Sequence, residues 1–373
     1  MTTTKMDFFQ SLRLSGVSTN RIKPELIEDF AINEVDMELL SKNQITVLDL
    51  TDELQKEVAK FSSVKNHLKV LDHEIKENWD TSKFVWAFYP WRKSLIKIPD
   101  QNVFETLRTI RNKFKILPGE QATLRTKKVG IIGLSVGHSV AIPLALERIC
   151  GTIRLADYDN LELSNLNRIA SSILDIGKKK VYNTARQLSE IDPFLNLECF
   201  ENGITAENIE EFLLGSGKLD LVIEECDSGD IKLLTRILCR KHRIPVIMET
   251  SDRGLLDIER FDLEPNRPLL HGMLNEHDFR HDLTAEEKRL LLLKSIDFDK
   301  VSERGAASMT EIGKSITNWP QLGTDVIAGG ATAAMAAKLI LLGEAVSSGR
   351  RYVDIQSIIR RNPEEDPTFG SAT

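Results

Sequence analysis

The sequence of 373 residues predicts an α/β protein built on a Rossmann-like, doubly wound and mostly parallel sheet. Short β-branched runs alternate with amphipathic helical stretches between residues 127 and 249. The first run meets Gly133, where a helical stretch follows, and the second ends at an acidic pair, Asp157 and Asp159. Glycine and the free N–H groups of a helix N-terminus suit a nucleotide phosphate, so we expect the ligand at the carboxyl ends of the strands.

The elements follow one another regularly along this part of the chain. We expect strands at 127–133, 152–157, 195–200, 219–225 and 244–249, and helices at 138–149, 178–191, 205–214 and 229–242. The apolar residues Val181, Ala185, Leu188 and Ile191 recur every three or four positions, which predicts a helix with one buried face. Such alternation is typical of a mostly parallel sheet that is covered on both sides.

Two helices are predicted beyond this region. Thr284 and Glu287 have the spacing of a capping box, which marks a helix start. Residues 326–343 form an apolar stretch close to the ~20 residues that span a bilayer. Lys338 and the many glycines and alanines favour a tightly packed internal helix, so we expect no membrane association.

The length of the chain predicts two or three domains or subdomains. We assign residues 1–100 to an α-rich N-terminal region, 101–262 to a nucleotide-binding domain, and 263–373 to its C-terminal part with a crossover loop, a closing helix and a disordered tail. The aromatic segment Trp79 to Trp91 allows two interpretations, stacking on bases or packing as a docking face on the nucleotide domain. The acidic balance of the chain favours packing.

Composition excludes several classes of protein. A net charge of −7 argues against a general nucleic-acid binder, because phosphate contacts need a basic surface. The four cysteines, at positions 150, 199, 226 and 239, form no C-x-x-C pair, so we expect neither zinc nor a disulfide framework. The N-terminus has no long apolar core, and we expect a cytoplasmic protein.

The turn after the first strand is a weak dinucleotide fingerprint when taken alone. Gly133, Ser135 and His138 stand where G-x-G-x-x-G would place glycines, and Gly137 comes one position early. A polar string then follows the acidic pair, with Ser164, Asn165, Leu166, Asn167 and Arg168, and after it Gly177 and three lysines. This cluster of amide and basic side chains suits a triphosphate better than a nicotinamide dinucleotide.

At these residues the sequence resembles the ThiF/MoeB/ubiquitin-activating superfamily, adenylyltransferases that activate a carboxylate. The resemblance covers roughly residues 108–261 and a small-residue helix near 328–343, and it includes the strand LDLVIEECD that ends at Asp227. The amino-acid sequences of several strands resemble those of a bacterial ThiF-like subfamily in which a nitroreductase-like domain often follows the ThiF part. Such a domain would lie beyond this chain, and any flavin chemistry would belong to it.

The resemblance implies roles for individual residues. It implies a nucleotide loop at Gly133, Ser135 and Gly137, phosphate binding by Asn165, Arg168 and Lys180, ribose binding by Asp157, and Mg²⁺ binding by Asp227, with Asp159 and Lys232 in support. In the family one arginine of an R-x-x-R segment reaches the triphosphate, in some members from a neighbouring subunit. Arg111 takes that place after Arg108, which implies a homodimer.

Two functional hypotheses follow. The first is an enzyme that uses ATP and Mg²⁺ to adenylate a carboxylate of a ubiquitin-like protein, a peptide or a small molecule. Because no cysteine follows Cys239, we expect no thioester step. The second is a binding protein that keeps the fold and holds NAD, flavin or a protein partner. Ser135, His138 and Ser228 depart from the family pattern and favour the second hypothesis, whereas the phosphate and magnesium residues favour the first.

Overall fold

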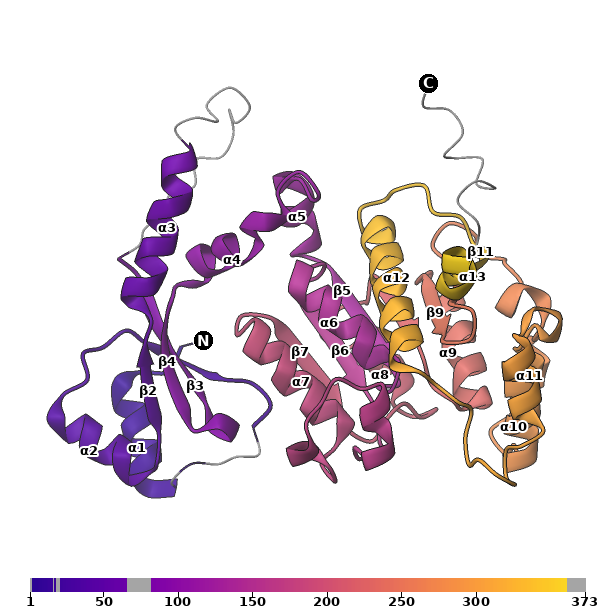
Figure 1. Ribbon diagram of the computed structural model, residues 1–373, viewed down its shortest axis with the longest axis horizontal. Helices are drawn as coiled ribbons and strands as arrows, with labels where there is room; N and C mark the ends of the chain where they lie inside the picture. Colours follow the sequence, from indigo (N-terminus) through magenta and orange to yellow (C-terminus); the bar gives the residue numbers. More distant parts are fainter. Residues whose placement is uncertain (1, 16, 18–20, 66–81, 361–373) are drawn as a thin grey trace. The chain divides into compact units, whose positions relative to one another are not determined.

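The computed structural model describes residues 2–15, 17, 21–65 and 82–360, and it contains two compact units (Figure 1). Unit 1 comprises Met1–Leu117 and Ser189–Phe194, and unit 2 comprises Pro118–Leu188 and Leu195–Thr373. The predicted disordered tail from residue 361 and residues 79–81 of the aromatic segment lie outside the described residues.

Unit 1 holds a four-stranded sheet that the sequence analysis did not predict. The strand order is β1-β3-β4-β2, with β1 and β4 antiparallel to β3 and with β2 parallel to β4. The strands are β1 (Glu25–Glu28), β2 (Thr46–Asp49), β3 (Phe84–Tyr89) and β4 (Ser94–Pro99). The helices are α1 (Lys5–Ser15), α2 (Glu34–Lys42), α3 (Thr51–Lys65) and α4 (Gln101–Thr109), with short 3-10 turns η1 (Pro90–Arg92) and η2 (Ile110–Asn112).

The aromatic segment supplies much of the core of unit 1. Trp86 and Phe88 on β3 are buried together with Phe8 of α1 and Leu95 of β4. Because the rings of Trp86 and Phe88 are 3% and 4% exposed, they are not available to stack on bases. The base-stacking interpretation therefore fails for these two residues. The proposed docking of this region onto the nucleotide domain stays a prediction.

Unit 2 holds a seven-stranded sheet with the order β11-β10-β9-β8-β5-β6-β7. Strands β5 to β9 are parallel and β10 and β11 are antiparallel, which confirms the predicted mostly parallel sheet. The strands are β5 (Lys128–Ile132), β6 (Thr152–Ala156), β7 (Asn196–Phe200), β8 (Leu221–Glu224), β9 (Val246–Thr250), β10 (Leu255–Glu259) and β11 (Gly349–Tyr352). The chain winds outward from β5 to β7 and then returns to β8, so the crevice at β5 is where a ligand is expected.

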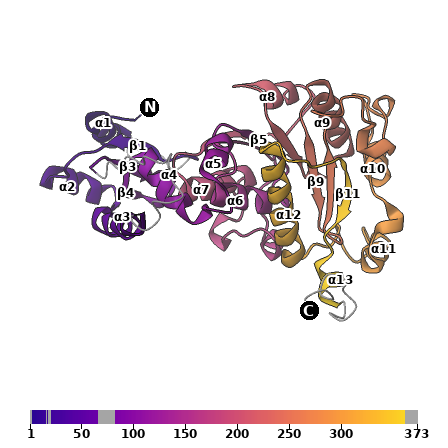
Figure 2. The ribbon, with the colours of Figure 1, turned by 90° about the horizontal axis from the view of Figure 1, so that it is seen from above.

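Helices cover both faces of this sheet (Figures 1 and 2). A Cβ atom at Gly130 would meet Phe212 of α8, and one at Gly137 of α6 would meet Ile131. Neighbouring strand residues point to opposite faces, so α6 and α8 lie on opposite sides of the sheet. The helices of unit 2 are α5 (Pro118–Leu124), α6 (Gly137–Glu147), α7 (Lys180–Ile191), α8 (Ile209–Leu214), α9 (Gly229–Lys241), α10 (Ala285–Lys294), α11 (Glu303–Met309), α12 (Gly323–Leu341) and α13 (Ile355–Arg360). Its 3-10 turns are η3 (Leu163–Asn167), η4 (Ile173–Asp175), η5 (Leu269–Gly272), η6 (Glu276–Asp278) and η7 (Phe298–Lys300).

The predicted capping box begins α10. The Thr284 hydroxyl accepts a hydrogen bond from the Glu287 backbone N–H, and the Glu287 carboxylate accepts one from the Thr284 N–H at 2.8 Å. The structure therefore confirms this helix start.

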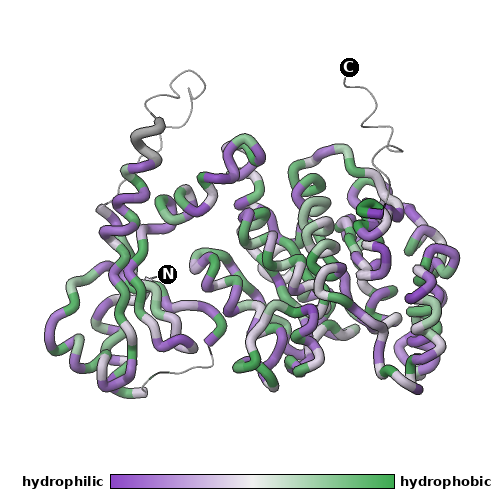
Figure 3. The backbone as a smooth tube through the Cα atoms, in the orientation of Figure 1, coloured by the Kyte–Doolittle hydropathy of each residue, from purple (hydrophilic) through white to green (hydrophobic). Residues whose placement is uncertain are grey.

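Helix α12 is largely hydrophobic (Figure 3) and packs inside unit 2. Among the described residues it is the one helix long and apolar enough to cross a membrane. Here it lies against α6, where a Cβ atom at Gly330 would be 2.5 Å from the Ser139 backbone oxygen. The Ser139 hydroxyl donates to the Val326 carbonyl at 2.9 Å, and Lys338 pairs with Glu147 at 3.0 Å. These contacts match the predicted internal helix.

Candidate functional site

The turn after β5 is held against the ends of two neighbouring strands. Gly133 has a φ of +85°, and a Cβ atom there would lie 2.7 Å from the backbone oxygen of Glu225 after β8. Only glycine combines this conformation with so close an approach. On the other side, the Leu134 N–H donates to Asp157 Oδ2 at 2.7 Å. Glycine is needed at position 133 because the turn after β5 lies against the backbone that follows β8.

Asp157 is buried at the end of β6 and organises the backbone around it. Its second carboxylate oxygen, Oδ1, accepts a hydrogen bond from the Asp159 N–H at 2.7 Å. Burial raises the pKa of Asp157, while the Leu134 N–H and the charge of Lys180 act in the opposite direction. Each carboxylate oxygen has two lone pairs, so the group can accept further hydrogen bonds from ribose hydroxyls.

Arg168 reaches back from η3 to the turn after β5. Its Nε donates to the Ser135 hydroxyl at 3.0 Å, and its Nη1 donates to Asn167 Oδ1 at 2.9 Å. Burial lowers the pKa of Arg168, and the negative charges of Asp227 and Glu162 oppose that effect. The structure thus brings the predicted phosphate-binding arginine to the predicted nucleotide loop, where Ser135 orients it.

Asn165 holds the segment that carries Arg168. Its side chain is buried, and its Oδ1 accepts a hydrogen bond from the Glu162 N–H at 3.1 Å, which caps η3. This is a structural contact, and phosphate binding by Asn165 stays a prediction.

The three lysines at the start of α7 have three different environments. Lys180 is buried, and its Nζ pairs with Asp159 Oδ2 at 2.9 Å. Lys178 pairs with Asp175, and Lys179 donates to two backbone carbonyls. Lys180 is therefore the lysine of this run that lies among the carboxylates of the predicted site, and phosphate binding by it stays a prediction.

Asp227 follows β8 and is exposed at the surface of unit 2. The protein around it still displaces enough water to raise the pKa of its carboxyl, and the charges of Lys232, Lys180 and Arg168 oppose this rise. No group of three or more His, Cys, Asp or Glu side chains in the described part of the chain is arranged to hold a metal. A single carboxylate nevertheless suits Mg²⁺ that is shared with substrate phosphates.

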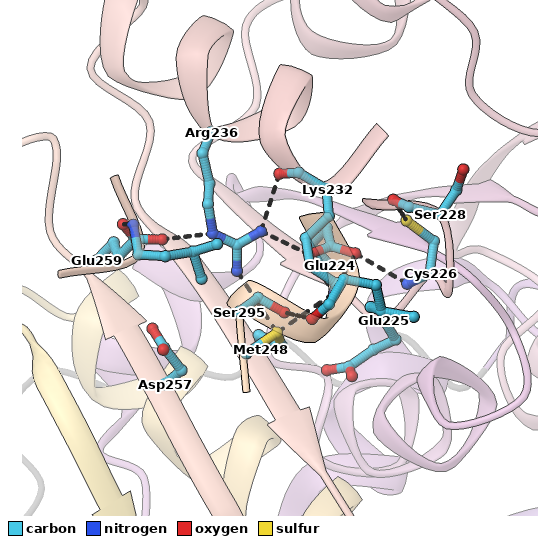
Figure 4. Close-up of polar contacts among 12 residues, drawn as sticks. Glu224, Glu225, Cys226, Ser228, Lys232, Arg236, Met248, Asp257, Glu259 and Ser295 are labelled. Carbon is cyan, nitrogen blue, oxygen red and sulfur yellow. Dashed lines mark hydrogen bonds and ion pairs between the residues drawn. The ribbon is translucent and has the colours of Figure 1, made fainter. Parts of the chain in front are cut away.

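A buried network of charged side chains is centred on Glu224 at the end of β8 (Figure 4). Glu224 accepts hydrogen bonds from Lys232 at 2.8 Å, from Arg236, and from the Cys226 N–H at 2.9 Å. Arg236 also donates to Glu259 Oε2 on β10 at 2.6 Å. Although burial alone raises it, the pKa of Glu224 falls to about 2 because Lys232 and Arg236 surround the carboxylate.

This network was only partly visible in the sequence. We expected Lys232 to be a supporting group, but Glu224, Arg236 and Glu259 were missed. The available signal was the spacing of Lys232 and Arg236, four residues apart on a helix whose same face carries the buried Leu233 and Cys239. The contact of Glu224 with the Cys226 N–H means that the network supports the turn that leads to Asp227.

A second buried acid was also missed. Glu249 on β9 lies against Gly329 of α12, and neither of its carboxylate oxygens has a hydrogen-bond partner among the described residues. Its backbone N–H donates to Glu225 Oε1 at 2.9 Å. Burial and the nearby Asp325 raise the pKa of Glu249 to about 8, so this group holds a proton at neutral pH.

The remaining predicted residues are placed as follows. The His138 ring is buried with its Nδ1 3.1 Å from the Thr184 hydroxyl, and burial lowers its pKa to about 4. It joins α6 to α7 as a neutral side chain. Gly137 allows α6 to pack closely on Ile131.

Arg111 lies in η2 of unit 1, and its role stays a prediction. Its neighbour Arg108 pairs with Asp192 at 3.1 Å.

Comparison with known proteins gives a family match. Residues 108–262 match the ThiF family. The uncharacterized protein MT1398 of Mycobacterium tuberculosis (strain CDC 1551 / Oshkosh) is 44% identical over 278 residues, which cover 74% of this chain and 38% of the relative. Ubiquitin-like modifier-activating enzyme 5 of Caenorhabditis briggsae is 26% identical over 164 residues, 41% of this chain and 38% of that enzyme.

Among solved structures, the E. coli tRNA N6-threonylcarbamoyladenosine dehydratase in complex with ATP is similar at 16% identity and a TM-score of 0.46. The match covers 64% of this chain and 95% of that one. The chain spans only 38% of the length of each of the two sequence relatives.

Proposed function

We propose that this chain is an ATP-dependent adenylyltransferase that activates a carboxylate, because residues 108–262 match the ThiF family. The observation that carries the proposal is the contact between Arg168 Nε and the Ser135 hydroxyl at 3.0 Å. It holds a guanidinium on the turn after β5, where a helix N-terminus already favours an anion. The charge of Lys180 acts on the carboxylates of both Asp157 and Asp227.

The proposed reaction forms an acyl-adenylate. A carboxylate oxygen of the substrate attacks the α-phosphorus of ATP, the bond from this phosphorus to the bridging oxygen breaks, and pyrophosphate leaves. Such a reaction needs positioning and stabilisation of charge on the phosphate oxygens more than it needs acid–base chemistry. Arg168 and Lys180 would bind those oxygens, and Asp157 would accept hydrogen bonds from the ribose hydroxyls.

Mg²⁺ would be held by Asp227 together with the phosphates, and it would neutralise charge on the leaving pyrophosphate. The exposed carboxylate of Asp227 fits this role because it leaves most coordination positions to water and substrate. The network of Glu224, Lys232 and Arg236 keeps the preceding turn in place.

We propose that the reaction proceeds without a cysteine thioester. Burial raises the pKa of the Cys150 thiol to about 12 and raises the pKa of Cys226 well above its usual value. Both thiols are therefore protonated at neutral pH and are poor nucleophiles. The acyl substrate is the carboxylate of a ubiquitin-like protein, of a peptide or of a small molecule; similarity to a ubiquitin-like modifier-activating enzyme supports the first of these.

Equilibrium binding of MgATP to the purified chain, measured by calorimetry, tests the proposal. We expect binding that requires Mg²⁺, that is lost in Arg168→Ala, and that loses its dependence on Mg²⁺ in Asp227→Ala. Arg289→Ala, which changes an exposed arginine on α10, serves as the matched control and should bind as the wild type does. Absence of MgATP binding, or binding of NAD that neither site variant changes, would overturn the proposal in favour of a nucleotide-fold binding protein.

A further inference from the structure

Asn167 is the last residue of η3, and its exposed side-chain amide makes two hydrogen bonds of opposite sense. Its Oδ1 accepts from Arg168 Nη1 at 2.9 Å, and its Nδ2 donates to the Gln321 carbonyl at 2.8 Å. A guanidinium can only donate and a carbonyl can only accept, so a side chain that bonds both must carry an acceptor and a donor. The asparagine amide meets this requirement, whereas an alanine side chain does not.

The Gln321 carbonyl belongs to the segment that enters α12. Two residues later, a Cβ atom at Gly323 would lie 2.7 Å from the Asn167 backbone oxygen, so the first residue of α12 rests directly on η3. The same turn of α12 is tied to α6, because the Ser139 hydroxyl donates to the Val326 carbonyl at 2.9 Å. The first turn of α12 therefore contacts both the helix that follows the turn after β5 and the end of η3.

Three polar contacts fix the guanidinium of Arg168. Its Nε donates to the Ser135 hydroxyl at 3.0 Å, and its Nη1 donates to Asn167 Oδ1 and, at 3.4 Å, to the Ser164 carbonyl. Within the described part of the chain no group accepts a hydrogen bond from Nη2, so this end of the side chain is left for a ligand. An arginine side chain has many rotamers, and a contact that holds it before the ligand arrives lowers the entropy cost of binding.

We infer that Asn167 is a positioning residue, which holds Arg168 for phosphate binding while the first turn of α12 is docked on η3. This inference rests on the proposed function and adds to it the element that controls the placement of Arg168. Asn167 acts through the guanidinium and touches no phosphate in this role. Because coupling between two events is reciprocal, displacing the start of α12 weakens nucleotide binding, and bound nucleotide favours the docked helix.

A double-mutant cycle tests whether Asn167 acts through Arg168. MgATP binding would be measured by calorimetry for the wild type, Asn167→Ala, Arg168→Lys and the double variant. Lysine keeps the positive charge but lacks the planar fork that Asn167 holds. Asn167→Ala should weaken binding by roughly 3- to 10-fold in the wild-type chain and have no effect in the Arg168→Lys chain. Asn266→Ala, which changes an exposed asparagine of unit 2, is the control and should bind as the wild type does.

Gly323→Ala tests the contribution of α12. The added methyl group would collide with the Asn167 backbone oxygen, so this variant should weaken MgATP binding by a similar factor. Gly119→Ala, in the first turn of α5 with nothing within 4 Å of the added Cβ atom, is the matched control and should leave binding unchanged. Urea unfolding of each variant shows whether it is folded under the conditions of the titration.

Three outcomes overturn the positioning role. Asn167→Ala could bind MgATP as tightly as the wild type, it could weaken binding equally in the wild-type and Arg168→Lys chains, or Gly323→Ala could leave binding unchanged. In each of these cases the wild type still binds MgATP and the proposed function stands. If the wild type does not bind MgATP, the proposed function fails and the positioning role fails with it.

Discussion

The Nε atom of Arg168 lies 3.0 Å from the hydroxyl oxygen of Ser135. This contact joins two turns that follow adjacent strands, β5 and β6. Ser135 occupies the position where a dinucleotide fingerprint has its second glycine. The serine hydroxyl accepts a hydrogen bond from the guanidinium, so the departure from glycine at this position is coupled to the placement of Arg168.

Ser135→Ala should weaken MgATP binding without abolishing it. A hydrogen bond to a charged group contributes about 1.5–3 kcal/mol, and Arg168 keeps its contact with Asn167, so we expect a loss of roughly tenfold. Arg168→Ala should have a much larger effect, because it removes the charge as well. Calorimetric titration with MgATP measures both. Unchanged affinity in Ser135→Ala would show that the serine does not orient Arg168.

Gly133→Ala should destabilise the protein more than Gly177→Ala does. Both glycines have positive φ angles, +85° and +81°, so alanine at either position is strained. A Cβ atom at Gly133 would also lie 2.7 Å from the Glu225 backbone oxygen, whereas nothing lies within 4 Å at Gly177. We expect the free energy of unfolding to fall by about 1 kcal/mol in Gly177→Ala and by about 3 kcal/mol or more in Gly133→Ala. Urea unfolding of the two variants decides this, and equal losses would argue against the close contact with β8.

Arg236→Met should lower the free energy of unfolding by about 3–5 kcal/mol. The arginine is fully buried between Glu224 and Glu259, and its loss leaves the Glu259 carboxylate buried without a cationic partner. Arg289→Met, at an exposed position of α10, is the matched control and should change stability little. Chemical denaturation gives both values. A loss no larger than that of the control would mean that the buried network is dispensable.

Glu249→Gln should stabilise the protein at alkaline pH. The pKa of Glu249 is raised to about 8 from 4.5, so the folded state keeps a proton that the unfolded chain releases. This destabilises the fold progressively as pH rises from about 4.5 to 8. Glutamine does not titrate in this range. The free energy of unfolding of the variant should therefore exceed that of the wild type by up to a few kcal/mol at pH 8 and equal it near pH 4.5.

Urea unfolding at pH 5, 7 and 8.5 measures this difference. Glu344→Gln changes an exposed glutamate of unit 2 and should show none of the pH dependence. A Glu249→Gln variant whose advantage does not grow with pH would contradict the buried, protonated carboxyl.

The parallel part of unit 2 was predictable because its signals are local. Strand and helix bounds from β5 to β9 differ from the predicted ones by a few residues at most. The antiparallel strand β11 was missed because it pairs with β10 across a long stretch of chain, and a run as short as Gly349–Tyr352 has no distinct periodicity. The same reason applies to unit 1, where β1 and β2 have four residues each.

The amino-acid sequence by itself determined the β-α-β order, the glycine at the turn and the polar residues that follow each strand, because period and turn chemistry depend on neighbours in the chain. Only the tertiary structure decided what those residues touch. It placed Arg168 on Ser135, packed His138 against Thr184 of α7, and buried Glu224 and Arg236 together as an ion pair. Such contacts depend on which strand ends meet, and that is a property of the folded sheet.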